Sequence, residues 1–343
     1  TPLLSDSSYP FNLKYKYSNI NYFISFDDIT IENQKIYLST ISFFFNQKSM
    51  SEKRLEKKSK QDANKHKLPN LPVAIQGYEG SFHQVAARSF YGKNVQILPC
   101  ATFPEVIKHS SDKLATMGGI MAIENSIAGS ILPNYNLLQK SALFVAGEVY
   151  LQIDQHLMVN PGVQLTDIKE VHSHPMALQQ CLGFLNQQGW KLIETEDTAL
   201  SAKHVHSRKS KHVAAIAGKL AAELFGLDII APKIHDVKNN YTRFLVLQQS
   251  PSEVEGANKA SINFQTDHSK GRLSEVLTVI AKEGINLSKL QSFPIAGSKF
   301  KYGFHADIEF DDIAQYNKLI RKLQKKTASL RVLGVYKKGK FNK

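Results

Sequence analysis

Five short polar clusters in this sequence place hydroxyl, amide, carboxylate and imidazole side chains next to apolar runs. The most unusual one ends in Thr242 and Arg243, which stand directly before the apolar run from Phe244 to Leu247. A hydroxyl can donate or accept a hydrogen bond, and a guanidinium can hold a carboxylate through two parallel bonds. Such groups at the mouth of a buried strand predict a binding or catalytic position. The clusters are GYEGSF (77–82), IENS (123–126), HSHPMALQQC (172–181), EDTA (196–199) and NNYTRF (239–244).

Taken singly, each cluster also has a purely structural explanation. Gly77 and Gly80 are suited to a turn, because glycine accepts the backbone angles that a tight turn needs. Ser81 and Thr198 are suited to capping a helix, and Asn125 to a local Asx turn. Helix starts at these points would also leave backbone N–H groups free to attract an anion. Several such starts facing one cleft would suit a small dianion.

Nucleotide, metal and disulfide chemistry are not predicted. No Gly-x-Gly-x-x-Gly pattern or phosphate-binding loop follows the first strand-like run, so no nucleotide site is expected. His172 and His174 lack a third ligand at a recognisable spacing, so no metal site is expected. Cys100 and Cys181 form no CxxC pair, which favours reduced thiols and a cytoplasmic protein. The sequence therefore predicts chemistry without a cofactor.

The net charge of +13 is concentrated near the ends of the chain. Residues 51–67 carry seven Lys/Arg against three acids, and residues 318–343 carry ten Lys/Arg and no acid. No base-reading module or basic strand with interleaved aromatics accompanies these runs, so no nucleic-acid partner is predicted. No run reaches the roughly 18 apolar residues of a membrane span, so no membrane partner is predicted either.

Residues 1–70 differ in composition from the rest of the chain. They are rich in Asn, Ser, Tyr, Phe and Lys and show no sustained period that could build a core. We expect them to be a disordered or non-native extension, with translation starting at Met50, the first methionine. An organelle transit peptide is the alternative, but Asp27, Asp28 and Glu32 disfavour it because such peptides avoid acids.

Between residues 71 and 250, short strand-like runs alternate with helical patterns, which predicts an α/β fold with parallel sheets. Two extended segments, near 148–159 and 227–236, are expected to cross between two lobes with a ligand cleft between them. A polar linker (251–258) precedes a βαββαβ pattern over 259–338, which predicts a small α+β domain, and a basic tail (339–343) follows. Helices are expected over 82–92, 102–111, 135–141, 175–189 and 198–210.

In this order, the clusters resemble the prephenate dehydratase family across residues 72–250, followed over about 259–338 by its ACT-type regulatory domain. The resemblance implies a two-lobed catalytic domain like a periplasmic binding protein and a ferredoxin-like ACT domain. Members convert prephenate to phenylpyruvate, losing the ring carboxylate as carbon dioxide and the ring hydroxyl as water, without a metal or redox step. The matching elements are GYEGSF, AIENSIAGS, YNLL, HSHPMALQQC, DTA, AAIAGKLAAELFGL and NNYTRFLVL.

The resemblance assigns the catalytic hydrogen bond to the leaving hydroxyl to Thr242. Arg243 beside it is expected to hold a carboxylate, or alternatively to pair with an internal acid, and Phe244 begins the strand that fixes both. Met176 replaces the usual glutamine of SHPQAL, a silent change if this helix position is solvated. The residues expected to line the substrate site are Gly80, Ser81, Asn125, Ser126, Ser173, Gln180 and Thr198.

The segment 271–294 resembles the part of the ACT domain that binds L-phenylalanine as a feedback inhibitor at a dimer interface. The resemblance therefore implies a homodimer or homotetramer. The chain departs from the family at Arg272 and at Gln291-Ser292-Phe293-Pro294, which replaces Glu-Ser-Arg-Pro. These departures change both elements of the family's effector motif. The positions expected to bind the effector are Gly271, Leu273, Asn286, Leu287 and Ser292.

Two other functions fit the same pattern. Arogenate dehydratase performs the same elimination on the transaminated substrate, and no motif in the sequence separates the two. A non-catalytic sensor of aromatic amino acids would use the same two-lobed fold. The sensor is disfavoured because binding alone does not need the hydroxyl of Thr242 at the leaving-group position.

Overall fold

A computed structural model of the chain describes residues 13–17, 20–24, 71–252, 254–267, 269–295, 297 and 301–342. The chain divides into two compact units, Thr1–Pro69 and Asn70–Lys343. In the first unit, β1 (Leu13–Tyr17) and β2 (Ile20–Ile24) pair antiparallel. This pair was not predicted, although LKYKY alternates apolar and charged residues as strands do. The expected start at Met50 lies outside the described residues.

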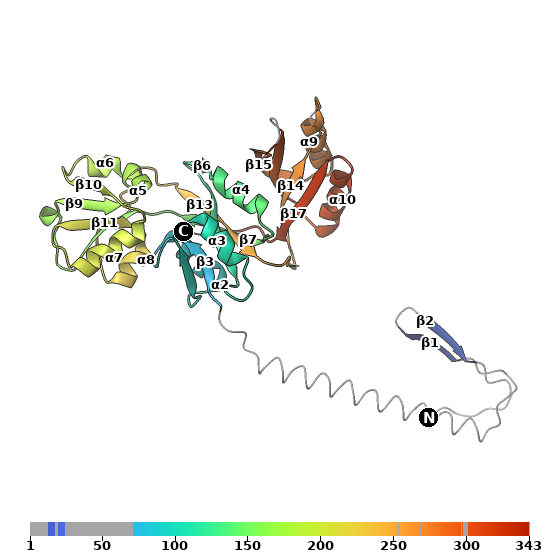
Figure 1. Cartoon of the computed structure of the whole chain (residues 1–343), viewed down its shortest axis with the longest axis horizontal. Helices are drawn as coiled ribbons and strands as arrows, with labels where there is room; N and C mark the ends of the chain where they lie inside the picture. The colour runs from blue at the N-terminus through green and yellow to red at the C-terminus, as the bar shows by residue number, and fades with distance from the viewer. Residues whose placement is uncertain are drawn as a thin grey trace, which may run out of the picture. The chain divides into compact units, whose positions relative to one another are not determined.

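Lobe 1 of the second unit is a mixed sheet covered by helices (Figure 1). Its strand order is β18-β7-β13-β5-β3-β4, and β6 pairs with β5. The strands are β3 (Val73–Gln76), β4 (Ile97–Cys100), β5 (Gly118–Asn125), β6 (Gly129–Ser130), β7 (Phe144–Gln152), β13 (Tyr241–Gln248) and β18 (Phe341–Asn342). The helices are α2 (Phe82–Tyr91), α3 (Phe103–Ser110) and α4 (Leu132–Lys140).

Lobe 2 is a second mixed sheet, in the order β10-β9-β11-β8-β12. Its strands are β8 (His156–Val159), β9 (Glu170–Ser173), β10 (Lys191–Glu194), β11 (Val213–Ala217) and β12 (Asp228–Ala231). Its helices are the 3-10 turn η1 (Leu165–Asp167), α5 (Pro175–Gln180), α6 (Leu182–Leu185), α7 (Thr198–Arg208) and α8 (Lys219–Phe225). The helix expected over 175–189 breaks at Cys181, because Asp236 takes up its backbone groups at Gln180 and Gly183.

The chain passes between the two sheets twice, through residues 153–155 and 232–240, close to the crossings expected near 148–159 and 227–236. Strand β7 leaves lobe 1 where β13 enters it, so β13 is antiparallel to both β7 and β5. For the same reason β8 is antiparallel to β12 and β11. The expected parallel pairing holds for β4-β3-β5 and β10-β9-β11, and the crossing strands make both sheets mixed.

The C-terminal domain has the expected βαββαβ order, with an antiparallel sheet in the order β15-β16-β14-β17. Its elements are β14 (Lys259–Gln265), α9 (Arg272–Lys282), β15 (Asn286–Pro294), β16 (Tyr302–Glu309), α10 (Ile313–Gln324) and β17 (Ser329–Tyr336). The expected basic tail also contributes structure, since Phe341 extends the sheet of lobe 1 as part of β18 and stacks on Tyr150 at 4.6 Å between ring centroids.

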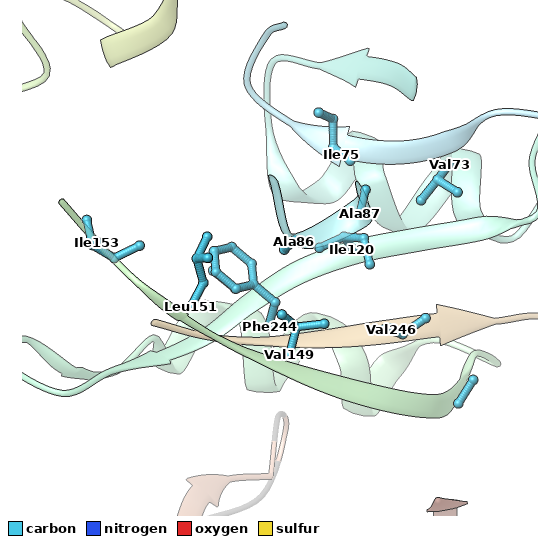
Figure 2. Close-up of a cluster of buried hydrophobic side chains, with 12 residues drawn as sticks. Val73, Ile75, Ala86, Ala87, Ile120, Val149, Leu151, Ile153, Phe244 and Val246 are labelled. Atoms are coloured by element: carbon cyan, nitrogen blue, oxygen red, sulfur yellow. The ribbon is translucent and has the colours of Figure 1, made fainter. Parts of the chain in front are cut away.

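The core of lobe 1 lies between its sheet and α2 (Figure 2). Val73, Ile120 and Val246 come from three neighbouring strands and are fully buried, while Ala86 of α2 packs against them. Figure 2 shows the ring of Phe244 projecting from β13 beside Leu151, in this same core. Burying such side chains is worth about 1.5–3 kcal/mol each, so the core holds β13 firmly in the centre of the sheet.

Lobe 1 meets the C-terminal domain through a buried charge cluster formed by Glu148, Arg243, Lys259 and Asp307, each at most 4% exposed. Arg243 donates to Glu148 at 2.7 Å and to Asp307 at 2.5 Å, and Lys259 donates to Glu148 at 3.0 Å. Burial alone raises the pKa of Asp307, but the charges of Arg243 and His305 hold that pKa well below its ordinary value. The cluster is therefore charged and balanced, with two cations facing two anions.

This depressed pKa predicts acid sensitivity. The stability that the Asp307 carboxylate contributes is complete above its unfolded pKa of about 3.9 and is lost as the pH falls below that value. We expect the free energy of unfolding in urea to fall steeply below about pH 4. Asp307→Asn should flatten this fall, whereas Asp228→Asn, at an exposed carboxylate, should not. Equal pH slopes in the wild type and in Asp307→Asn would contradict the prediction.

Candidate active site

A cleft of about 360 Å³ is lined by residues of both lobes and of the first crossing between them. Its apolar lining combines three phenylalanines with aliphatic side chains and one methionine, and its polar lining consists mainly of amide and hydroxyl groups with two imidazoles and two carboxylates. The lining residues are Gln76, Ser81, Phe82, His83, Phe103, Ala122, Asn125, Ile131, Ile153, Gln155, His174, Met176, Ala177, Gln180, Glu196, Asp197, Thr198, Thr242 and Phe244.

Thr242 and Asn125 lie opposite each other on neighbouring strands, β13 and β5, at the edge of this cleft. The side-chain amide of Asn125 donates to Thr242 Oγ1 at 3.1 Å. A bulge follows directly, because Arg243 pairs with Glu124 and Phe244 pairs with Ala122, which leaves one extra residue on β5. Bulges re-aim side chains next to functional sites. Since Thr242 Oγ1 accepts a hydrogen bond from Asn125, its own proton is available for donation into the cleft.

A chain of amides connects this pair to lobe 2. Asn125 Nδ2 also donates to Asn240 Oδ1 at 2.7 Å, and Asn240 Nδ2 donates to Gln180 Oε1 at 3.2 Å. Asn240 is only 1% exposed and lies on the second crossing between the lobes. The backbone N–H groups of Ile127 and Ala128 donate to Asn125 Oδ1, which fixes the orientation of its amide. Gln180, predicted from its helical spacing, thus reaches the cleft.

Two helix starts open on the cleft, as the sequence predicts. Ser81 is the N-cap of α2, and its side chain accepts from Gln84 N. Asp197 is the N-cap of α7, accepts from Leu200 N at 2.9 Å and is followed by Thr198 in the lining. Burial raises the pKa of Asp197 above its usual value, and its bonds to the first turn of α7 oppose this rise. Both helices are long enough to carry the partial positive charge of a helix N-terminus.

Four predicted site residues do not line the cleft. Arg243 lies on the opposite face of β13 from Thr242, because neighbouring residues on a strand alternate, and it pairs with internal acids in the buried charge cluster. Ser173 is fully buried and donates to the carbonyl of Ile216 at 2.6 Å. Arg243 and Ser173 therefore make structural contacts behind the cleft and do not face into it.

The other two support the loops around the cleft. Gly80, at φ 87°, packs so closely on α8 that a Cβ there would lie 2.9 Å from Ala221 Cα. Ser126 accepts from Tyr241 N at 2.9 Å and donates to the carbonyl of Asn239 at 3.2 Å, which ties the end of β5 to the start of β13.

Several lining residues were missed by the sequence interpretation. His83 lies two positions after Ser81 on α2, contacts Phe244 edge to face at 5.0 Å and accepts from Ala122 N. Burial lowers the pKa of His83 to about 3, so its ring is neutral at pH 7. Gln155 is 3% exposed, and within the described part of the chain its Oε1 has no hydrogen-bond partner. Their sequence signals were weak, because a helical histidine and a glutamine between strands are common.

Met176 and Glu196 also line the cleft. Met176 was expected to be silent if its helix position was solvated, but it adds an apolar group to the wall of lobe 2 although it is 44% exposed. Glu196 accepts from the hydroxyl of Tyr78 at 3.1 Å, which links the two lobes at the cleft. Glu196 belongs to EDTA (196–199), one of the five polar clusters whose order along the chain pointed to this site.

The positions expected to bind an effector lie at the start of α9 and along β15. Gly271 is the N-cap of α9 with φ 83°, and Leu273 packs on the core of the domain. Asn286 and Ser292 are exposed, Leu287 is partly buried, and none of the five lines the cleft between the lobes. Strand β15 is an edge strand in the sheet of the described chain, so its outer side is open to a partner.

In the described part of the chain, no group of three His, Cys, Asp or Glu side chains is placed to hold a metal ion. His172 instead pairs with Glu170 at 3.2 Å. Among the described residues, no helix has both the length and the apolar character needed to cross a bilayer.

Comparisons with known proteins identify the family of the chain. The model of the prephenate dehydratase family matches residues 73–252. The chain is 36% identical over 283 residues to arogenate dehydratase/prephenate dehydratase 1 of Arabidopsis thaliana, covering 77% of this chain and 71% of that protein. The structure of an Arthrobacter aurescens prephenate dehydratase in complex with L-Phe aligns with a TM-score of 0.69 at 25% identity, covering 78% and 90%.

A further solved structure, described as a novel type of quorum-quenching acylase, aligns with a TM-score of 0.71 at 29% identity and covers 79% of this chain and 99% of that one. The likeness to it shows that a protein described as an acylase has this fold along nearly its whole length. The family model covers the segment that builds the cleft, with Asn125, Gln180 and Thr242 inside it. The chain therefore belongs to the prephenate dehydratase family.

Proposed function

We propose that this chain catalyses the decarboxylating dehydration of prephenate to phenylpyruvate. The observation that carries the proposal is the hydroxyl of Thr242, oriented by Asn125 at 3.1 Å and facing an aromatic-lined cleft between two lobes. In the reaction the bond between the ring and its carboxylate breaks, carbon dioxide leaves and the electron pair enters the ring. The ring hydroxyl then leaves with its bonding electrons and takes up one proton to become water.

Thr242 assists the departure of the hydroxyl by hydrogen bonding. Threonine has a pKa far above neutrality, so it donates a hydrogen bond to the developing negative charge rather than acting as a free acid. Its orientation is fixed before the substrate binds, since Asn125 is itself held by Asn240 and by backbone N–H groups. Preorganised donors of this kind lower the barrier because they need no rearrangement during the reaction.

The lining of the cleft suits loss of the ring carboxylate. Among the described lining residues there is no lysine or arginine, so no side chain with a permanent positive charge stabilises the carboxylate that must leave. Phe82, Phe103 and Phe244 provide apolar walls for the ring. The starts of α2 and α7 supply donors for the carboxylate of the pyruvyl group, which remains in the product.

Arogenate is the second candidate substrate. It carries an ammonium group where prephenate has a keto oxygen. The cleft offers Glu196 and Asp197, from lobe 2, as carboxylate partners for that ammonium. The Arabidopsis relative is named for both activities, so the likeness to it is compatible with either substrate. Incubating the purified protein with each substrate and following phenylpyruvate or phenylalanine tests the proposal. Absence of turnover with both substrates would favour a non-catalytic sensor.

Thr242→Ala is expected to reduce kcat by about 10²–10⁴-fold, because the hydrogen bond to the leaving hydroxyl is lost. The threonine is half-buried and its methyl group contributes little packing, so the unfolding midpoint should change little. Thr242→Ser is the control and should retain much of the activity, since it keeps the hydroxyl. Steady-state kinetics of the three proteins decide the point, and full activity in Thr242→Ala would show that the threonine has another role.

Glu196→Gln is expected to separate the two substrates. Loss of a carboxylate near the ammonium should lower kcat/KM for arogenate about tenfold, or about 1.4 kcal/mol, and leave kcat/KM for prephenate unchanged or higher. Glu194→Gln is the control, because Glu194 is exposed at the end of β10, two residues before Glu196, and does not line the cleft. A uniform loss for both substrates would indicate that Glu196 acts through its bond to Tyr78 instead.

We further propose that the C-terminal domain is an ACT regulatory domain that binds L-phenylalanine. Its βαββαβ order and the L-Phe complex of the Arthrobacter relative support this. We place the effector at Gly271, Leu273, Asn286, Leu287 and Ser292. A second copy of the chain would complete that site, which makes the protein a homodimer or a homotetramer. Phe293 is 4% exposed, lies over Gly303 and borders a cavity with Gln139 of lobe 1 and Arg331, so the side chain that replaces the family's arginine is buried.

L-phenylalanine is expected to inhibit turnover in a dose-dependent manner and to raise the unfolding temperature, because a ligand that binds only the native state stabilises it. Gly271→Val, which adds a branched side chain at φ 83°, should weaken both effects while basal activity persists. Light scattering after size-exclusion chromatography measures the accompanying oligomeric state. A flat inhibition curve with an unchanged unfolding temperature would contradict the sensor role.

For the compartment, we propose the cytoplasm. Cys100 and Cys181 are both free and buried, and reduced thiols are typical of a reducing compartment. Burial raises the pKa of Cys100 to about 11 and that of Cys181 to about 12, so both thiols are unreactive at neutral pH. The Arabidopsis relative is named as chloroplastic, so localisation of the tagged full chain in its own cells is the direct test.

A further inference from the structure

The C-terminal domain holds the two residues that stand directly next to Asn125 and Thr242. Glu124 precedes Asn125 on β5, Arg243 follows Thr242 on β13, and the two lie opposite each other in the sheet. Because side chains alternate along a strand, Asn125 and Thr242 face the cleft while Glu124 and Arg243 face away from it. The C-terminal domain contacts this second face.

Two ion pairs make the contact. Lys289 of β15 donates to Glu124 at 2.5 Å and to Ser130 of β6 at 2.7 Å. Asp307 of β16 accepts from Arg243 at 2.5 Å and is itself held by Ser261. The side chains of Arg243 and Asp307 are at most 5% exposed, and those of Lys289 and Glu124 are 16% and 30% exposed. Both pairs are shielded enough from solvent for their geometry to matter.

We propose that Lys289 and Asp307 are positioning residues for catalysis, which hold β5 and β13 in the register that brings Asn125 to Thr242. The inference rests on the proposed dehydratase function. The register is irregular at this very point, where the bulge after Arg243 interrupts the ladder. A bulge leaves one residue unpaired, so the regular ladder alone does not define the relation of the two strands there. The ion pairs of Lys289 with Glu124 and of Asp307 with Arg243 fix the relative position of the two strands there.

Lys289 also lies on the strand that carries three of the proposed effector positions. A displacement of β15 would therefore reach Glu124 directly and Asn125 one residue later. The path is short and consists of one ion pair and one strand. It connects the C-terminal domain to the reacting hydroxyl although none of the domain's described residues lines the cleft.

Lys289→Met tests the proposal, because methionine keeps the length of the side chain and removes the charge. We expect kcat to fall about tenfold with KM within about twofold, since small displacements of reacting groups have effects of this size. Lys289→Arg keeps an ion pair with Glu124 and should restore most of kcat. Arg331→Met is the matched docking control, because Arg331 ties the same two domains through the carbonyls of Gln139, Ser141 and Leu143, away from β5 and β13.

Arg331→Met should lower the unfolding temperature and leave kcat within about twofold of the wild type. Unchanged kcat in Lys289→Met, or an equal loss in Arg331→Met, would overturn the proposal, because the contact would then serve only docking. Asp307→Asn provides a second variant with the same expectation for kcat, although its burial makes it the less stable protein.

Hydrogen–deuterium exchange gives a readout that does not depend on turnover. Exchange in peptides covering 120–127 and 240–246 should rise in Lys289→Met and stay at the wild-type level in Arg331→Met. A wild type that converts neither substrate would contradict the proposed function, while exchange would still decide whether Lys289 orders these strands. A wild type that is active, with equal exchange in all variants and equal kcat, would contradict the positioning role alone.

Discussion

The pairing of Arg243 with Glu148 and Asp307 is the interaction on which the rest of the structure depends. A guanidinium that is 4% exposed is tolerated only with charged partners, because an unpaired buried charge costs several kcal/mol. Its partners come from β7 and from β16 of the C-terminal domain, so satisfying Arg243 requires that domain to dock on lobe 1. The opposite face of β13, which carries Thr242, lines the cleft. One strand therefore contributes both to the interface with the C-terminal domain and to the candidate active site.

The second constraint is the double crossing between the lobes. Because β7 leaves lobe 1 where β13 returns, the central strands run antiparallel and the residues of the crossings line or border the cleft. Asn240 on the second crossing bonds to both Asn125 and Gln180, so the two lobes share one row of amides. Neutral donors of this kind orient a small anion without adding a cation that would retain the departing carboxylate, which is why the cleft fits an elimination better than it fits simple anion binding.

Much of this could be predicted from local patterns. The strand and helix alternation, the βαββαβ order and the position of the polar clusters at strand ends and helix starts follow from signals within a few residues. The assignment of Ser81, Asn125, Gln180, Thr198 and Thr242 to one site came from the resemblance to the family, and all five line the cleft. The exceptions have physical causes. The helix expected over 175–189 breaks because Asp236, distant in sequence, competes for its backbone groups. Ser173 looked like a site residue but turns to the carbonyl of Ile216, its neighbour across the sheet.

What the sequence by itself determined is the set of elements and the order of the chemical groups along them, because propensity, periodicity and capping act over short separations. Only the tertiary structure decided which face each group occupies. Thr242 and Arg243 occupy opposite faces of β13, and the charges of Glu148 and Asp307, far from residue 243 in sequence, draw Arg243 to the interface and leave the hydroxyl of Thr242 facing the cleft. That choice depends on long-range charge pairing in a buried interface, which local sequence cannot encode because the partners come together only when the chain has folded.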